Sequence, residues 1–182
     1  MNPQTSDQPN PETISPQPAA DTGSDLALQL YPLIARQPFF KGLSAPQLQV
    51  LAESAMQVAF KDDEPIFREG EPANRFYLIL EGQVALESEV KEHGTVQIQT
   101  LGPDDNLGWS WLFPPYYLHF SARAVGPVSA IFFYGTRLRE QCETDHELGY
   151  ELMKRITETL IQNLHATQQR LMECAVADDL TK

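Results

Sequence analysis

"FREGEPANRFYLILEGQVAL", residues 67–86, decides the fold that we expect for this chain of 182 residues. Apolar and aromatic residues form two short runs here, separated and preceded by Gly, Pro and Asn. Such runs are typical of β-strands joined by tight turns. The segment therefore predicts strands at 75–81 and 83–90, with a tight turn at Gly82.

The same texture continues on both sides of this segment. In "TVQIQT", Val96 and Ile98 alternate with polar residues, as expected of a strand with one wet face, and Gly94 closes a second hairpin. Further short β-prone runs lie at 57–60, 65–67, 95–101, 119–125 and 128–134. Seven or so short strands predict a barrel or a sandwich.

Helical patterns flank this β region, so the fold is expected to be mainly β with flanking helices. "DLALQLYPLIARQPFF" predicts a short helix broken near Pro38. A second short helix follows, because Ser44 and Gln47 have the spacing of a capping box. Asp145 could cap a third helix, which contains no proline and approaches ~45 Å at ~1.5 Å per residue.

That last helix is longer than a small barrel needs for cover. It carries a broad apolar stripe, which either lies on the barrel or pairs with a second copy or a partner protein. We favour a homodimer through this helix. The expected interface residues are Met153, Ile156, Leu160, Asn163, Leu164, Thr167 and Leu171.

Composition divides the chain into four parts. Residues 1–25 are rich in Pro, Gln, Ser and Thr and predict a disordered tail, either a passive extension or a docking arm. Residues 26–142 form the expected barrel domain and 143–174 the long helix. Residues 175–182 form an acidic stub.

Charge and targeting signals limit the classes of partner. The net charge of −12 disfavours binding to nucleic acid or to anionic membranes. No run of eighteen apolar residues and no basic, apolar leader is seen, so we expect a cytoplasmic protein. Cys142 and Cys174 are interpreted as ordinary thiols, and the four histidines lack metal-ligand spacing.

The 67–86 segment, with "LIARQPFFKGLSAPQLQVLAESA" before it, resembles a cyclic nucleotide-binding domain of the catabolite-activator type. Gly70 and Gly82 match the two turn glycines of that family, and Leu101-Gly102-Pro103 resembles the approach to its phosphate-binding cassette. The resemblance covers about residues 27–174. It implies a β-roll or jelly-roll barrel and a regulatory binding function.

The cassette of this chain, "NLGWSWLFPPYYLHFSARA" at 106–124, departs from the family pattern. Gly108 matches the family glycine, but Trp109 stands where the ribose-binding Glu belongs and Leu118 where the phosphate-binding Arg belongs. The resemblance implies that neither cyclic AMP nor cyclic GMP binds by the usual geometry. The candidate ligand-binding residues of this degenerate cassette are Gly108, Trp109, Ser110, Trp111, Leu112, Leu118, His119, Ser121, Arg123 and Thr167.

Two of these candidates carry a second interpretation. Arg123 matches an ordinary strand arginine of the family rather than the phosphate ligand. Thr167 falls on a threonine that touches the base in the family, but it also suits the helix seam.

No catalytic motif is present, so we expect a non-catalytic protein. Ser110 and His119 lack the context of a nucleophile elbow. One hypothesis is a sensory module whose pocket is filled, or lined for a planar ligand, by aromatics. The alternative is an accessory subunit of a larger, hydrogenase-like complex that docks through the cassette loop. The family's transcription factors continue into a DNA-binding domain, whereas this sequence stops at Lys182.

Overall fold

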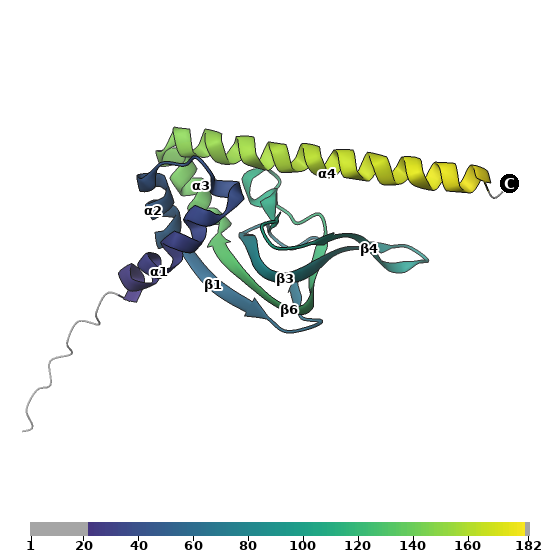
Figure 1. Cartoon of the computed structure of the whole chain (residues 1–182), viewed down its shortest axis with the longest axis horizontal. Helices are drawn as coiled ribbons and strands as arrows, with labels where there is room; N and C mark the ends of the chain where they lie inside the picture. The colour runs from purple at the N-terminus through teal and green to yellow at the C-terminus, as the bar shows by residue number, and fades with distance from the viewer. Residues whose placement is uncertain (1–21, 181–182) are drawn as a thin grey trace, which may run out of the picture.

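A computed structural model describes the backbone of residues 22–180 and the side chains of residues 26–173. Figure 1 shows a curved sheet with α1, α2 and α3 gathered at one end and α4 running above it. The helices are α1 (Thr22–Arg36), α2 (Ala45–Glu53), α3 (Gly135–Thr144) and α4 (His146–Leu180), with short 3-10 helices η1 (Pro38–Phe40) and η2 (Trp109–Leu112). The strands are β1 (Ala55–Phe60), β2 (Pro65–Phe67), β3 (Arg75–Val90), β4 (Gly94–Leu101), β5 (Asn106–Leu107) and β6 (Ser121–Tyr134).

The strands form one antiparallel sheet in the order β1-β6-β3-β4, with β2 on β6 and β5 on β3. β3 and β6 are long and pair from Arg75 opposite Tyr134 to Glu87 opposite Ser121, so they form the spine of the roll. This arrangement confirms the mainly β fold with flanking helices.

The two glycine turns have different outcomes. The hairpin at Gly94 is confirmed, because Val90 pairs with Gly94 where β3 meets β4. The reversal expected at Gly82 is wrong, because β3 runs through this residue with a shift in register. Gly82 has φ 88°, and a Cβ there would lie 2.3 Å from the carbonyl oxygen of Pro127. The glycine therefore permits a close backbone crossing inside a bent strand.

Both expected helix caps are present. The backbone N–H of Ser44 donates to Gln47 Oε1 at 3.0 Å, and the N–H of Gln47 donates to Ser44 Oγ at 3.5 Å, which completes the capping box. Asp145 Oδ1 accepts from the N–H groups of Glu147 and Leu148, both at 3.0 Å. These bonds, led by the one from Leu148, lower the pKa of the Asp145 carboxyl.

Two expected boundaries need correction, and one helix was not expected. α1 begins at Thr22, inside the expected tail 1–25, while residues 1–21 lie outside the described part of the chain. α3 was not foreseen as a separate helix. α4 begins at His146 and continues to Leu180, so most of the expected stub 175–182 is helical and not a separate segment.

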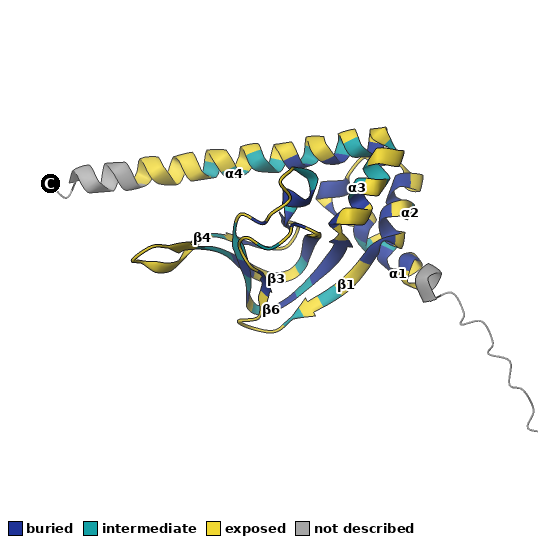
Figure 2. Ribbon diagram, turned by 180° about the vertical axis from the view of Figure 1, so that it is seen from behind, coloured by how far each residue is buried: buried dark blue, intermediate teal, exposed yellow. Residues whose placement is uncertain are grey.

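Buried side chains form two clusters. One lies between the helices and one face of the sheet, and the other lies inside the roll between its strands. Figure 2 shows buried positions concentrated in the sheet and the helices beside it, whereas the far part of α4 is exposed. In the described range, no helix combines the length and apolarity needed to span a bilayer.

Candidate functional site

The cassette begins at Gly108, which turns the chain from β5 into η2. Gly108 has φ 83°, and a Cβ there would lie 2.3 Å from the carbonyl oxygen of Arg75. An L side chain would be strained by the backbone conformation and would also collide with β3. The family glycine is therefore needed here to hold the cassette against the sheet.

The two tryptophans of η2 point to different surroundings. Trp111 is 0% exposed and belongs to the core cluster beneath the helices, where its ring centroid lies 6.1 Å from that of Phe76. Trp109 is half-buried, and its ring centroid lies 6.0 Å from that of His119. Leu112 is also half-buried against the first core cluster. The aromatic cassette thus packs largely into its own domain.

Between the cassette and α4 lies a cavity of only about 30 Å³. Of the candidate ligand residues, Gly108, Trp109, Ser110, Leu118 and His119 line it; Phe67, Leu86, Leu101, Asn106, Leu107, Phe120 and Asn163 complete the lining. Pockets for small ligands usually measure ~300–1,000 Å³, whereas a single water needs ~10–15 Å³. The cavity has room for about one or two waters.

Leu118 occupies the position of the family's phosphate arginine. Its side chain is 3% exposed and packs in the cluster inside the roll. Its backbone bonds fix it in place, because its N–H donates to the Glu71 carbonyl and its carbonyl accepts from the Gly70 N–H, both at 2.9 Å. Among the described residues that line the cavity, none is a lysine or an arginine.

Arg123 lies away from that cavity. Its Nε donates to Glu87 Oε2 at 3.2 Å and its Nη1 to Asp63 Oδ1 at 3.3 Å. The hydrogen bond to Glu87 is the main cause of a raised Arg123 pKa. Ser121, on the same stretch of β6, accepts from the Glu69 N–H at 3.0 Å. Neither residue reaches the cassette cavity, so the structure separates both from the other candidates.

Thr167 is separated from the cavity as well. It is exposed, and its hydroxyl donates to the carbonyl of Asn163 one turn earlier at 2.9 Å. Asn163 lines the cavity instead, where its Oδ1 accepts from Gln99 Nε2 at 3.4 Å. The sequence placed Asn163 only at the helix seam.

The outer part of the cassette loop is solvent-facing. Tyr116 and Tyr117 are 39% and 51% exposed, after an exposed Pro-Pro pair. Arg139 of α3 lies over the Tyr116 ring, 4.6 Å from its centroid, and donates from Nη1 to the Trp111 carbonyl at 2.6 Å. The loop therefore has a buried side made by tryptophan and an exposed side made by tyrosine.

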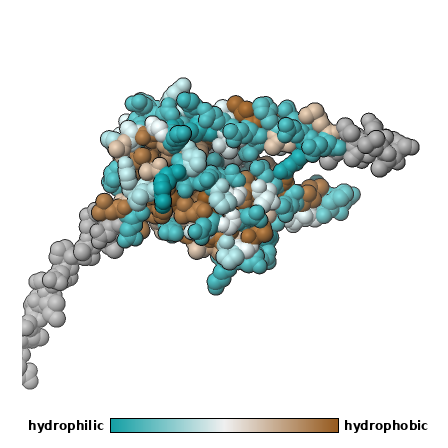
Figure 3. Space-filling model, viewed as in Figure 1, coloured by the Kyte–Doolittle hydropathy of each residue, from teal (hydrophilic) through white to brown (hydrophobic). Residues whose placement is uncertain are grey.

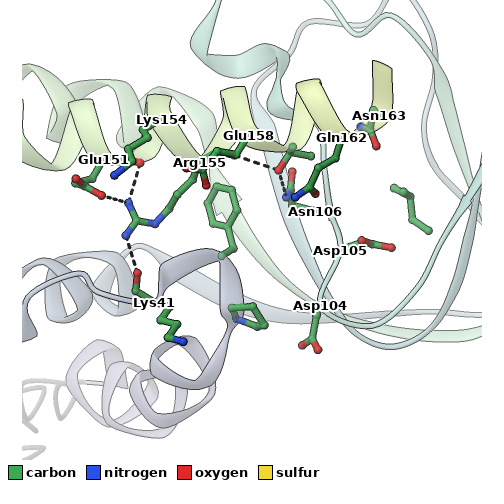
Figure 4. Close-up of a pocket in the computed structure, with 14 residues that line it drawn as sticks. Lys41, Asp104, Asp105, Asn106, Glu151, Lys154, Arg155, Glu158, Gln162 and Asn163 are labelled. Atoms are coloured by element: carbon green, nitrogen blue, oxygen red, sulfur yellow. Dashed lines mark hydrogen bonds and ion pairs between the residues drawn. The ribbon is translucent and has the colours of Figure 1, made fainter. Parts of the chain in front are cut away.

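Sequence reasoning missed a second, larger cleft of about 450 Å³. It lies between α4, η1 and the segment that joins β4 to β5 (Figure 4). Its lining is polar and charged on most sides, and it includes Lys41, Asp104, Asn106, Lys154 and Glu158. Because these residues come from separate segments of the chain, no local sequence motif predicts the cleft.

The cysteines and histidines show no site of their own. Burial raises the pKa of the Cys142 thiol to about 11, with Asp145 and Glu143 adding to the effect, so this thiol is protonated at neutral pH. The side chain of Cys174 is outside the described part. In the described residues, no three His, Cys, Asp or Glu side chains are grouped to hold a metal ion.

Comparisons with known proteins agree with this architecture. Residues 57–145 match the sequence profile of the cyclic nucleotide-binding domain. The CRP-like cAMP-activated global transcriptional regulator of Mycobacterium tuberculosis is 25% identical over 146 residues, which cover 80% of this chain and 63% of the regulator. The chain thus spans less than two thirds of the length of that curated relative.

Solved structures are similar over most of the chain. A candidate cyclic nucleotide-binding protein from Geobacter metallireducens GS-15 is 29% identical, with a TM-score of 0.65 and coverage of 79% of this chain and 98% of that one. A cyclic nucleotide-binding domain from Methylobacillus flagellatus KT is 17% identical, with a TM-score of 0.69 and coverage of 83% and 85%; at that identity the likeness shows the fold alone.

An antiparallel roll with a cassette turn and a long helix beside it is the fold that this chain shares with these solved structures. Residues 57–145 of this chain form a cyclic nucleotide-binding domain, and 80% of the chain is similar to a CRP-like regulator. The curated relatives are a transcriptional regulator and, at 39% identity over 61 residues, the cAMP-dependent protein kinase regulatory subunit of Dictyostelium discoideum. Both are regulatory proteins.

Proposed function

We propose that this chain is a non-catalytic regulatory module whose cassette pocket is closed to cyclic AMP and cyclic GMP. The observation that carries the proposal is the cavity of about 30 Å³, walled by Trp109 and Leu118 at the positions of the family's two anchors. A cyclic phosphate drawn out of water needs oriented donors and a cation. Arg123 does not supply that cation, because Glu87 and Asp63 hold it elsewhere.

Loss of these contacts has a large expected effect on affinity. Each charge-assisted hydrogen bond contributes about 1.5–3 kcal/mol, so the loss of two weakens binding by roughly two to four powers of ten. The ligand would also have to displace the packed Trp109 and Leu118 side chains. The net charge of −12 adds repulsion toward a free anion and toward a DNA backbone.

Isothermal titration of the whole chain with cyclic AMP and with cyclic GMP is expected to show no binding in the micromolar range. Arg123→Ala serves as the matched control, because it removes the nearest strand arginine without touching the cavity; it should leave the titration unchanged. A micromolar or tighter dissociation constant, lost in Arg123→Ala, would show that Arg123 acts as the phosphate ligand and would overturn the proposal.

We infer that the module acts as a dimer through α4. Met153, Leu164 and Leu171 are 45%, 56% and 66% exposed, and they lie on one strip of the helix. Figure 3 shows hydrophobic side chains exposed among hydrophilic ones along the long helix. Ile156 was expected at the interface, but it is 0% exposed and lies in the domain core. Leu160, also expected there, packs against the same core.

The second candidate function is that of an accessory subunit that docks through the exposed side of the cassette loop. Exposed Tyr116 and Tyr117 favour it, because tyrosines dominate many interface hot spots. The cation–π contact from Arg139 holds Tyr116 in one orientation before any partner arrives. The docking surface would then use the tyrosines and not the tryptophans.

Intrinsic tryptophan emission tests whether the tryptophans of the loop pack into the domain or face a partner. The chain has only two tryptophans, of which Trp111 is 0% exposed and Trp109 half-buried. We expect a blue-shifted emission maximum and weak quenching by acrylamide, with Trp111→Phe leaving the more accessible Trp109 signal. A red-shifted, readily quenched emission from the wild type would mean that the tryptophans face outward and would favour docking through them.

A further inference from the structure

A basic and aromatic surface lies at the end of the sheet where α3 begins. It is formed by residues 72–75, 114–117 and 134–139, which contain three arginines, three tyrosines and three prolines but no Asp or Glu. In the whole chain, by contrast, 25 acidic residues outnumber 13 Lys and Arg. We call these three segments the Arg–Tyr surface; its charge is opposite to that of the chain as a whole.

Backbone hydrogen bonds join the three segments. The N–H of Ala73 donates to the Tyr116 carbonyl at 2.7 Å, which fixes the cassette loop beside residues 72–75. The N–H of Gly135 donates to the Asn74 carbonyl at 2.8 Å, which fixes the start of α3 on the other side of the same residues. The three segments therefore form one continuous surface.

Exposed cations and exposed rings lie together on this surface. Arg75 pairs with Tyr134 across the sheet, and Arg137 Cζ lies 5.9 Å from the centroid of the Tyr134 ring. Tyr134 and Tyr117 are 44% and 51% exposed, and Arg75 and Arg137 are exposed as well. Among the described residues, no carboxylate lies within 4 Å of the guanidinium nitrogens of Arg75, Arg137 or Arg139. The surface can therefore pair with acidic groups from a segment that lies outside the described part.

Two glutamates flank these segments in the sequence without cancelling their charge. Glu140 faces away from the surface, because it lines the groove between α2, α3 and the start of α4. Glu71 acts on the edge of the surface at Tyr77, where burial raises the pKa of the phenol. Of the two charges that act on that phenol, Arg75, which lowers its pKa, has a larger effect than Glu71, which raises it. The positive charge therefore dominates at this edge.

The first 21 residues of the chain have the complementary composition. This segment, "MNPQTSDQPNPETISPQPAAD", contains five prolines, two Asp and one Glu, and no Lys, Arg or His. Its carboxylates can pair with the exposed arginines. Proline-rich segments in the polyproline II form bind to surfaces lined by aromatic rings, which the tyrosines provide here. Both the charge and the composition of the segment thus match the Arg–Tyr surface.

The segment is also long enough to reach this surface. It joins α1 at Thr22, and Figure 1 shows α1 and α3 at the same end of the sheet. In the polyproline II form, 21 residues span about 65 Å at ~3.1 Å per residue, or about twice the ~30 Å diameter of a small domain. Because the segment is tethered, its effective concentration at the surface is in the millimolar range, so that weak contacts suffice.

We propose that residues 1–21 dock on the Arg–Tyr surface of their own chain, with the carboxylates at Arg75 and Arg137 and the prolines on Tyr117 and Tyr134. The docked segment would cover the exposed side of the cassette loop and would have to leave before a partner could bind there. The inference goes beyond the proposed function, because it needs only the exposed surface and holds whether or not a partner docks on it.

A nitroxide spin label in the segment tests this contact. Ser15→Cys carries the label in the full chain, in which Cys142→Ala and Cys174→Ser remove the native thiols. Proton–nitrogen correlation NMR then records the paramagnetic broadening of each amide signal. We expect broadening at Asn74 and Tyr117 but not in the β3–β4 hairpin at the far end of the sheet (Figure 1). A mixture of spin-labelled chains with separate isotope-labelled chains should show no such broadening.

Charge variants of the segment leave the folded domain untouched. Asp7→Asn with Glu12→Gln removes two of its three carboxylates. An exposed ion pair changes an equilibrium by a factor of roughly 1.4–5, so the loss of two should lower the ratio of docked to free segment roughly 2–25-fold. The broadening at the Arg–Tyr surface should fall accordingly. A rise in salt to 1 M, where the Debye length is about 3 Å, should have the same effect.

Charge variants of the surface complete the test. Arg75→Gln with Arg137→Gln should also reduce the broadening roughly 2–25-fold. Lys61→Gln with Lys91→Gln is the matched control, because it removes two exposed positive charges outside the surface and should leave the broadening unchanged. The proposal is overturned if no signal of the surface is selectively broadened, if the neutral segment broadens it equally, if the arginine variant equals the lysine control, or if the broadening arises between separate chains.

Discussion

Trp111→Ala is expected to lower the free energy of unfolding by about 3–5 kcal/mol, which is a large part of the stability of a small domain. Trp111 is 0% exposed and packs between Phe76 and the first residue of α3. A Cβ added at Gly135 would lie 2.6 Å from the Trp111 Cβ, so the cassette and α3 meet closely at this point. Denaturant unfolding followed by circular dichroism measures the effect.

Two companion variants separate packing from the indole N–H. Trp111 Nε1 is buried with no described hydrogen-bond partner, so Trp111→Phe removes an unsatisfied donor and should cost less than Trp111→Ala. Trp109→Ala should also cost less, because Trp109 is half-buried. A loss below about 1 kcal/mol for Trp111→Ala would show that the cassette is not part of the core.

Sequence patterns predicted the helix caps and one hairpin because these features depend on interactions between residues that are close together in the chain. The capping box of Ser44 and Gln47, the cap at Asp145 and the hairpin at Gly94 each depend on residues within a few positions of one another. Gly82 looks the same in the sequence as Gly94. Its role depends on the backbone of Pro127, 45 residues away, which no local pattern reports.

The resemblance predicted where the cassette lies in the sequence, but it did not predict how the side chains of the cassette pack. Gly108, Trp109 and Leu118 line one cavity, as their positions in the motif predict. Arg123 and Thr167 do not, because their directions are set by the β6 register and by the turn of α4. The cleft between α4, η1 and the β4–β5 segment could not be predicted, since Lys41, Asn106 and Lys154 come together only after the helix and the roll have packed.

The exposed apolar strip of α4 is the basis of the second prediction, which concerns the stability of a dimer. Leu164 and Leu171 follow Met153 by about three and five whole helical turns, so the three exposed side chains form one strip. Contacts between α4 and the roll use other side chains, such as Thr159 with Asn106 and Arg170 with the Ile98 carbonyl. A second copy can therefore cover the strip without disturbing the domain.

Leu164→Glu with Leu171→Glu is expected to raise the dimer dissociation constant at least about 100-fold, because each buried leucine contributes roughly 1.5–3 kcal/mol and the dimer loses four of them. Sedimentation equilibrium should show a particle of twice 20.5 kDa for the wild type and a monomer for the double variant. Gln169→Glu adds one negative charge per chain on another face of α4, compared with two in the double variant, and should remain dimeric. A monomeric wild type, or a Gln169→Glu variant that dissociates as readily as the double variant, would mean that the strip does not pair two copies. If the variants have equal free energies of unfolding as monomers, a folding defect is excluded as the cause of dissociation.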